Sequence, residues 1–156
     1  MSEYNEIHTL LATCSGEVIR LEDVSDEVFS SGMLGTGFAI IPENNDFFSP
    51  VSGKITNAYE TGHAYSITTK EGIDVLVHIG VDTVELDGQY FNPVVKTDMS
   101  VSQGDKLAQA DTGNILSRGY DPVTVVIVTN PERLNKFSIS YGKINAKGVV
   151  MEYSIK

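Results

Sequence analysis

The segment from Gly62 to Gly80 constrains the fold more than any other part of the chain. One strand-like run enters a turn at Lys70-Glu71-Gly72, and a second, strongly apolar run leaves it. This pattern predicts an antiparallel β-hairpin. His63 and His78 lie near its open end, fifteen residues apart.

The position of the hairpin loop decides how the two imidazoles face each other. A two-residue loop at Glu71-Gly72 would make residues 70 and 73 opposite, and His63 and His78 would then lie diagonally on one face of the hairpin. A loop one residue earlier, at Lys70-Glu71, would place the two histidines directly opposite. Either register predicts that the rings come within reach of each other.

The rest of the chain repeats short runs rich in β-branched residues between turns, with 14 glycines among its 156 residues. Single-turn helices are expected after Ser25, Asp82 and Asn130, each a candidate N-cap. The chain is therefore predicted to be all-β, an antiparallel β-sandwich or barrel with a few single-turn helices. We predict strands over residues 10–13, 16–21, 37–41, 53–59, 63–69, 73–79, 106–110, 123–128, 136–142 and 149–155.

The sequence shows no linker that would divide it, and its length suits one domain with a substantial core. The turn-and-strand segment Ser15–Ile19 is echoed by Ser52–Thr56, which favours a fold of two similar, duplicated β motifs. The alternative is that glycine-containing turns resemble each other by chance. We expect residues 1–9 to form a mobile leader and residues 10–156 to form the domain.

Charge and hydropathy exclude several kinds of partner. The formal net charge is −10, and the 11 basic residues are scattered, whereas nucleic acids and anionic membranes attract basic patches. The longest apolar run, Val123 to Val128, is far too short to span a bilayer. The N-terminus carries Glu3 and Glu6, with no basic segment before the apolar run Leu10-Leu11-Ala12, which is unlike a secretory signal. We expect a cytoplasmic protein without direct membrane insertion.

Paired histidines suit two chemistries. One is ligation of a divalent metal, with Asp82 as a possible third ligand. The other is phosphoryl transfer, in which one neutral imidazole attacks phosphorus and the second donates an N–H to the phosphoryl oxygens. Thr61 could hold His63 in the tautomer that this requires. Cys14, the only cysteine, allows neither an intramolecular disulfide nor a cysteine-based zinc site. These residues alone leave metal and phosphate equally open.

Several segments resemble the glucose-class enzyme IIA of the bacterial sugar phosphotransferase system. The most specific is V-H-I-G-V-D-T-V-E-L, residues 77–86, which follows T-G-H-A at residues 61–64. Residues 15–24 and 50–55, Gly104-Asp105 and the closing Ile-Lys also fit, so the resemblance covers nearly all of the chain from about Leu10 onward. It favours phosphate over metal.

This resemblance implies a compact antiparallel β-sandwich that acts as a phosphocarrier, a phosphotransferase component that needs no metal or other cofactor. His78 would accept phosphate on Nε2 from the phosphohistidine carrier HPr and pass it to a cysteine of a IIB domain. His63 would assist by stabilising the phosphate, Thr61 would orient His63, and Asp82 would support the site.

Transfer between proteins also requires an apolar surface that excludes water around the reacting groups. Leu76 lies two residues before His78 and so shares its face of the predicted strand. We expect Leu76 to belong to this partner surface, together with Phe38, Ile40 and Tyr59.

Two other functions compete with the phosphocarrier. Certain zinc-dependent cell-wall peptidases resemble this architecture, but they carry a His-x-His pair, and this sequence has none. The second is a regulatory protein in which phosphorylation of His78 gates binding to transporters or enzymes. It would use the same site, so it does not exclude the carrier role. The sugar that such a system takes up is not predicted.

Overall fold

The computed structural model describes residues 6–156. Residues 1–5 of the predicted leader lie outside this part. The predicted boundary after residue 9 is wrong, because His8 and Thr9 already pair with Tyr153 and Glu152 as part of an antiparallel ladder. The first strand is therefore tied into the domain by backbone hydrogen bonds.

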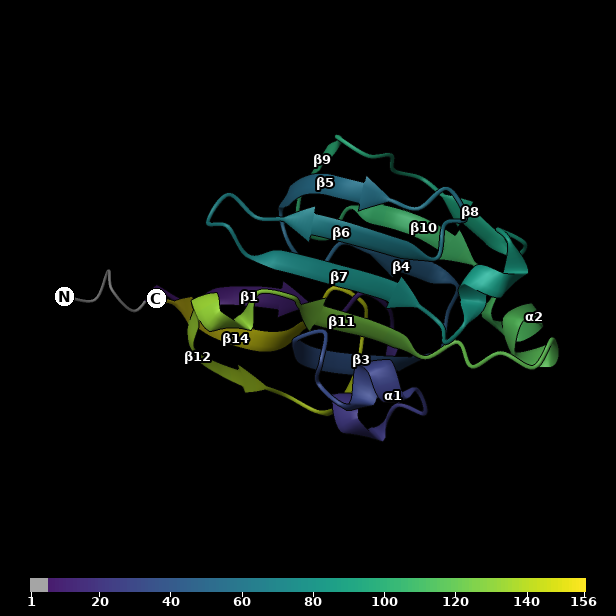
Figure 1. Cartoon of the computed structure of the whole chain (residues 1–156), viewed down its shortest axis with the longest axis horizontal. Helices are drawn as coiled ribbons and strands as arrows, with labels where there is room; N and C mark the ends of the chain where they lie inside the picture. The colour runs from purple at the N-terminus through teal and green to yellow at the C-terminus, as the bar shows by residue number, and fades with distance from the viewer. Residues whose placement is uncertain (1–5) are drawn as a thin grey trace.

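The predicted all-β antiparallel fold is confirmed: within residues 6–156 the strands form one eight-stranded and two three-stranded sheets. The large sheet has the order β13-β2-β3-β11-β7-β6-β5-β9, and the small sheets have the orders β1-β14-β12 and β4-β10-β8. Figure 1 shows β5, β6, β7, β11 and β3 in succession, with α1 beside β3. The strands are β1 (His8–Leu11), β2 (Gly16–Arg20), β3 (Thr36–Pro42), β4 (Asp46–Phe48), β5 (Gly53–Ala58), β6 (Ala64–Thr68), β7 (Asp74–Ile79), β8 (Phe91–Pro93), β9 (Ser100–Val101), β10 (Lys106–Ala110), β11 (Thr124–Val128), β12 (Leu134–Ile139), β13 (Gly142–Ile144) and β14 (Val149–Ile155).

The helices are short, and none described here has the length and hydropathy needed to traverse a bilayer. Helix α1 forms where one was predicted, but Asp26 rather than Ser25 caps it, accepting a hydrogen bond from the Val28 N–H at 2.8 Å. Asp82 and Asn130 precede helical turns as predicted, although neither side chain caps its turn. The helices are η2 (Leu21–Asp23), α1 (Glu27–Ser30), η3 (Thr83–Leu86), α2 (Thr112–Ser117) and η4 (Pro131–Arg133).

Strand β7 divides its side chains between two apolar clusters. Val75, Val77 and Ile79 are buried in the main core. The opposite face carries His78, whose partner in β11 is Val125, a member of the smaller cluster that includes Phe29 of α1. The alternation of apolar residues thus turns His78 away from the main core.

The hairpin between β6 and β7 has a longer loop than either predicted register. The Thr69 N–H donates to the Ile73 carbonyl at 2.9 Å, which leaves a three-residue loop at 70–72. Ala64 lies opposite His78. Both predicted loops are therefore wrong, and strand alternation alone would place His63 on the face opposite His78.

Candidate functional site

His63 reaches His78 because it lies before the first residue of β6. The chain turns at Gly62, which has a φ of +79° and donates its N–H to the Tyr59 carbonyl at 2.8 Å. The His63 carbonyl then accepts the Ile79 N–H at 2.7 Å. The two ring centroids lie 5.0 Å apart, edge to face. The predicted contact between the rings is confirmed, although the turn rather than the strand register produces it.

The hydrogen bond from His78 determines which of its ring nitrogens can react. Its Nδ1 lies 2.8 Å from the Gly80 carbonyl oxygen. A carbonyl can only accept, so Nδ1 must carry the proton. In the neutral ring, Nε2 then holds a free lone pair, which makes it a nucleophile or a metal ligand.

Burial keeps both imidazoles neutral. The pKa of His78 is lowered from its ordinary value mainly by burial, against the opposing effects of the Gly80 hydrogen bond and the charges of Asp26 and Asp82. Burial, and then the neighbouring charge of His78, lowers the pKa of His63 to about 4. His63 is 3% exposed. Near pH 7 the site therefore contains two uncharged rings.

Thr61 contacts His63 as predicted, with its Oγ1 2.5 Å from Nδ1. A hydroxyl can donate to Nδ1, and the proton of the neutral ring then lies on Nε2. The rings of Tyr59 and Phe91 pack edge-on to His63, at centroid distances of 5.3 and 6.4 Å. Phe91 comes from β8, a three-residue strand with no sequence signal that could connect it to the histidines.

Asp82 influences the pair through charge rather than contact. Its side chain is exposed, makes no capping hydrogen bond, and acts on the pKa of His78 as a nearby negative charge. Within residues 6–156, no three His, Cys, Asp or Glu side chains cluster closely enough to hold a metal ion. Asp82 therefore does not join the two histidines in a three-residue cluster of the kind that the metal alternative would use.

The four residues predicted for the partner surface differ in exposure, and contact with a partner stays a prediction for those that are exposed. Leu76 is partly exposed on the His78 side of β7, and Tyr59 is 45% exposed beside His63. Phe38 and Ile40 are fully buried in the main core, so their assignment to the surface is wrong. The reason is the strand register. Val125 of β11 pairs with His78 on one side and with Ala39 on the other, so Ala39 shares the face of His78, and residues 38 and 40 point to the main core.

Exposed apolar side chains that the sequence analysis missed lie on the two short helices beside the end of β7. Val28 of α1 is 48% exposed and Val84 of η3 is 55% exposed. Helix α1 also places the ring of Phe29 5.1 Å from that of His78. In the sequence, an apolar residue shortly after a capping residue can indicate such a surface. Periodicity gives no help here, because each of these helices has only four residues.

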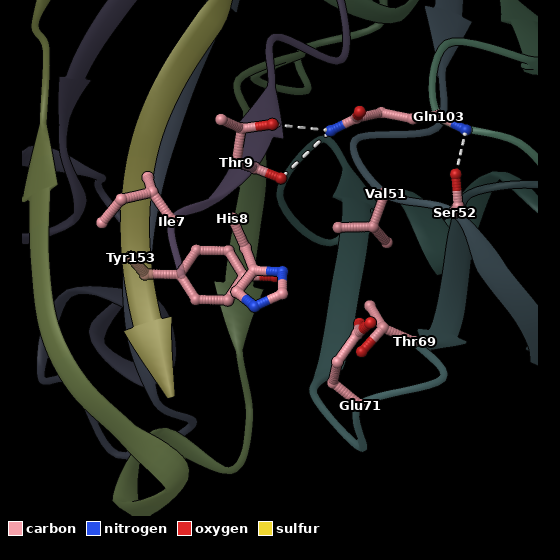
Figure 2. Close-up of a pocket in the computed structure, with 9 residues that line it drawn as sticks. All are labelled: Ile7, His8, Thr9, Val51, Ser52, Thr69, Glu71, Gln103 and Tyr153. Carbon is pink, nitrogen blue, oxygen red and sulfur yellow. Dashed lines mark hydrogen bonds between the residues drawn. The ribbon is translucent and has the colours of Figure 1, made fainter. Parts of the chain in front are cut away.

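The third histidine does not join the pair. His8 stacks on Tyr153, with 5.4 Å between the ring centroids, in a separate cavity of about 230 Å³ (Figure 2). There the Gln103 side-chain amide donates to the carbonyl and hydroxyl oxygens of Thr9. Cys14 is also separate: it is buried, and burial raises its pKa to about 12, so its thiol is not an activated nucleophile.

The fold and the site together define a class of protein: antiparallel β-sandwiches with a pair of neutral histidines at the surface end of a central strand. A model of the EIIA 1 family of the phosphoenolpyruvate-dependent sugar phosphotransferase system matches residues 8–134. The chain belongs to this family, as the sequence resemblance predicts.

Similar proteins place the chain in the glucose class of this family. It is 42% identical over 147 residues to the PTS system glucose-specific EIIA component of Mycoplasma capricolum, covering 94% of this chain and 96% of that protein. The solved structure of glucose permease IIA from M. capricolum matches with a TM-score of 0.89 and 39% identity, covering 96% and 97% of the two chains. The β-glucoside-specific EIIBCA component of Bacillus subtilis is 42% identical over 140 residues, 89% of this chain but only 23% of that protein.

Proposed function

We propose that this chain is a phosphocarrier that takes phosphate from phosphorylated HPr onto Nε2 of His78 and delivers it to a cysteine of a IIB domain in the cytoplasm. The observation that carries the proposal is the hydrogen bond from Nδ1 of His78 to Gly80, because it leaves Nε2 as the reactive nitrogen. Membership of the EIIA family supports this use of the site.

The two transfers balance without any other reactant. In the first, the lone pair of His78 Nε2 forms a bond to phosphorus while the N–P bond of phosphorylated HPr breaks and its electron pair returns to the donor imidazole. The Nδ1 proton stays in its hydrogen bond to Gly80. In the second transfer, a IIB thiolate attacks the phosphorus, the N–P bond of His78 breaks, and the ring returns to its neutral form.

His63 assists as a hydrogen-bond donor. With Thr61 donating to Nδ1, His63 can offer its Nε2–H to a phosphoryl oxygen beside the ring of His78. The phosphorylated ring of His78 keeps its Nδ1 proton and is therefore cationic. The negative charges of Asp26 and Asp82, which already favour the charged form of His78, stabilise it.

An apolar surface around the histidines suits transfer between two proteins. Leu76 and Tyr59 lie beside the pair, and Val28 and Val84 extend the surface over the neighbouring helices. Contact of a partner with these side chains would exclude water, which would otherwise hydrolyse the N–P bond. A IIB partner is supported by relatives whose names, EIIBCA and EIICBA, join B and A units in one protein.

Transfer of labelled phosphate from phosphorylated HPr tests the proposal. The protein should gain an acid-labile phosphate, and His78→Ala should remove it. His8→Ala is the matched control, because His8 lies in the separate cavity, and it should be labelled like the wild type. A wild-type protein that stays unlabelled, or a His78→Ala protein labelled at the wild-type level, would refute the proposal.

The assisting role of His63 needs a separate measurement. His63→Gln should still accept phosphate on His78 but should deliver it more slowly to a IIB domain, because the donor to the phosphoryl group has changed. The two half-reactions can be followed by rapid quenching with labelled HPr and with purified labelled carrier. Unchanged rates in both half-reactions would show that His63 does not assist.

A further inference from the structure

The peptide groups around Gly80 are held at several points, and their position fixes the tautomer of His78. The Val81 N–H, which shares a peptide group with the Gly80 carbonyl, donates to the Asp121 carbonyl at 2.9 Å. In the preceding peptide group, the Gly80 N–H donates to the Val123 carbonyl at 2.9 Å. Both bonds join the turn to the start of β11, and both are made by backbone atoms.

Thr83 supplies a third hydrogen bond to this turn, and unlike the other two it is made by a side chain. Its Oγ1 donates to the Ile79 carbonyl oxygen at 2.6 Å, and the residue is fully buried. Gly80 has a φ of +86°, and a Cβ placed on it would collide with Cγ2 of Thr83. The hydroxyl thus holds the peptide group before Gly80, while the methyl group packs directly against Gly80 itself.

We propose that Thr83 is a positioning residue for phosphate transfer: it holds the Gly80 turn so that the carbonyl meets Nδ1 of His78 and leaves Nε2 unprotonated. The inference rests on the proposed role of His78 as phosphate acceptor. Thr83 does not touch the imidazole. It acts through the two peptide groups that connect Ile79 to Val81.

Loss of the Thr83 hydroxyl would therefore change the tautomer of His78 while leaving the imidazole in place. The Ile79 carbonyl would lose a buried partner, and the turn could relax away from the ring. His78 would then populate the tautomer with its proton on Nε2, which has no lone pair to attack phosphorus. The rate of phosphate acceptance should fall with the population of the Nδ1–H tautomer.

Nitrogen NMR of ¹⁵N-histidine-labelled protein measures this population without phosphate, with His78→Ala assigning the signals. Thr83→Val keeps the size and shape of the side chain but not the hydroxyl. We expect it to show a substantial Nε2–H tautomer at His78 and to accept phosphate from phosphorylated HPr about three- to tenfold more slowly, as for the loss of one hydrogen bond. Thr83→Ser restores the hydroxyl and should restore both readouts.

Thr13→Val is the matched control, because Thr13 is fully buried and its hydroxyl has no hydrogen-bond partner within the described residues. It should leave the tautomer and the transfer rate unchanged. A folded Thr83→Val protein with the wild-type tautomer would overturn the proposal. If Thr83→Val does not fold, Thr83→Cys replaces it: a thiol of similar size is a weak donor, and a wild-type tautomer in that protein overturns the proposal equally.

The tautomer measurement also separates this inference from the proposed function. A wild-type protein that phosphorylated HPr does not label would reject His78 as phosphate acceptor, whatever Thr83 does. A changed tautomer in Thr83→Val would still show that Thr83 positions the ring. A slower transfer with an unchanged tautomer would show that Thr83 acts by another route, and the proposal would be wrong.

Discussion

The burial of His63 predicts that the protein loses stability in mild acid through this one side chain. The pKa of His63 is about 4, against 6.5 for an ordinary histidine, chiefly because burial disfavours its charged form. Between these two values the unfolded chain binds a proton that the folded chain does not. The stabilisation is therefore complete above about pH 6.5 and is lost as the pH falls towards 4.

The magnitude follows from the two pKa values. At pH 5 the unfolded histidine is almost fully protonated and the folded one is mostly neutral, which lowers the free energy of unfolding by about 2 kcal/mol relative to pH 7. His78 acts in the same direction, since its pKa is also lowered. Comparison of the wild type with His63→Gln isolates the part that belongs to His63, because glutamine does not titrate.

Urea unfolding followed by far-ultraviolet circular dichroism is a suitable assay, because the chain has no tryptophan to report on its core. The wild type should lose about 2 kcal/mol more than His63→Gln between pH 7 and pH 5. The same substitution at His8 measures the contribution of a histidine outside the pair. Equal pH dependence in the wild type and His63→Gln would refute the account of a buried, neutral His63.

Three further substitutions test how the pair is held. Thr61→Val should leave His78 able to accept phosphate but slow delivery to IIB about three- to tenfold, since the hydrogen bond to His63 is lost; a rapid-quench assay would show it. Gly62→Ala should cost more unfolding free energy in urea than Gly32→Ala, because both have positive φ but only at Gly62 would a Cβ meet neighbouring side chains within 3.4 Å. Asp26→Ala should lower the free energy of unfolding by about 1 kcal/mol through loss of the α1 cap, measurable in the same assay.

The fold could be predicted from the sequence because its signal is local. Short apolar runs mark the longer strands, whether alternating as in β7 or continuous as in β11, and the alternation in β7 places Leu76 on the face of His78. Strands β4, β8, β9 and β13 have only two or three residues, too few for alternation to show. Helix α2 was missed because Gly113 interrupts its helical pattern, although Asp111 provides a cap.

The site could be predicted only in part because its geometry depends on distant segments. The error at Phe38 and Ile40 arises because the face of β3 that meets His78 is decided by its register with β11, and β11 lies more than 80 residues away in sequence. The sequence locates the loop near residues 70–72 correctly but predicts two residues where the structure has three. The extra loop residue means that strand alternation places His63 on the face opposite His78. The two rings still meet because the chain turns at Gly62.

The two histidines have opposite hydrogen-bonding roles for a reason that lies in their Nδ1 partners. A backbone carbonyl can only accept, so it forces the proton of His78 onto Nδ1 and frees Nε2 to attack. A hydroxyl can donate, so Thr61 can leave the proton of His63 on Nε2, where it serves as a donor. Burial makes both rings neutral, and the role of His78 depends on this, because a protonated His78 has no lone pair. The same burial makes the site a source of acid instability, so the loss of stability predicted below pH 6.5 follows from the state of the rings that the reaction requires.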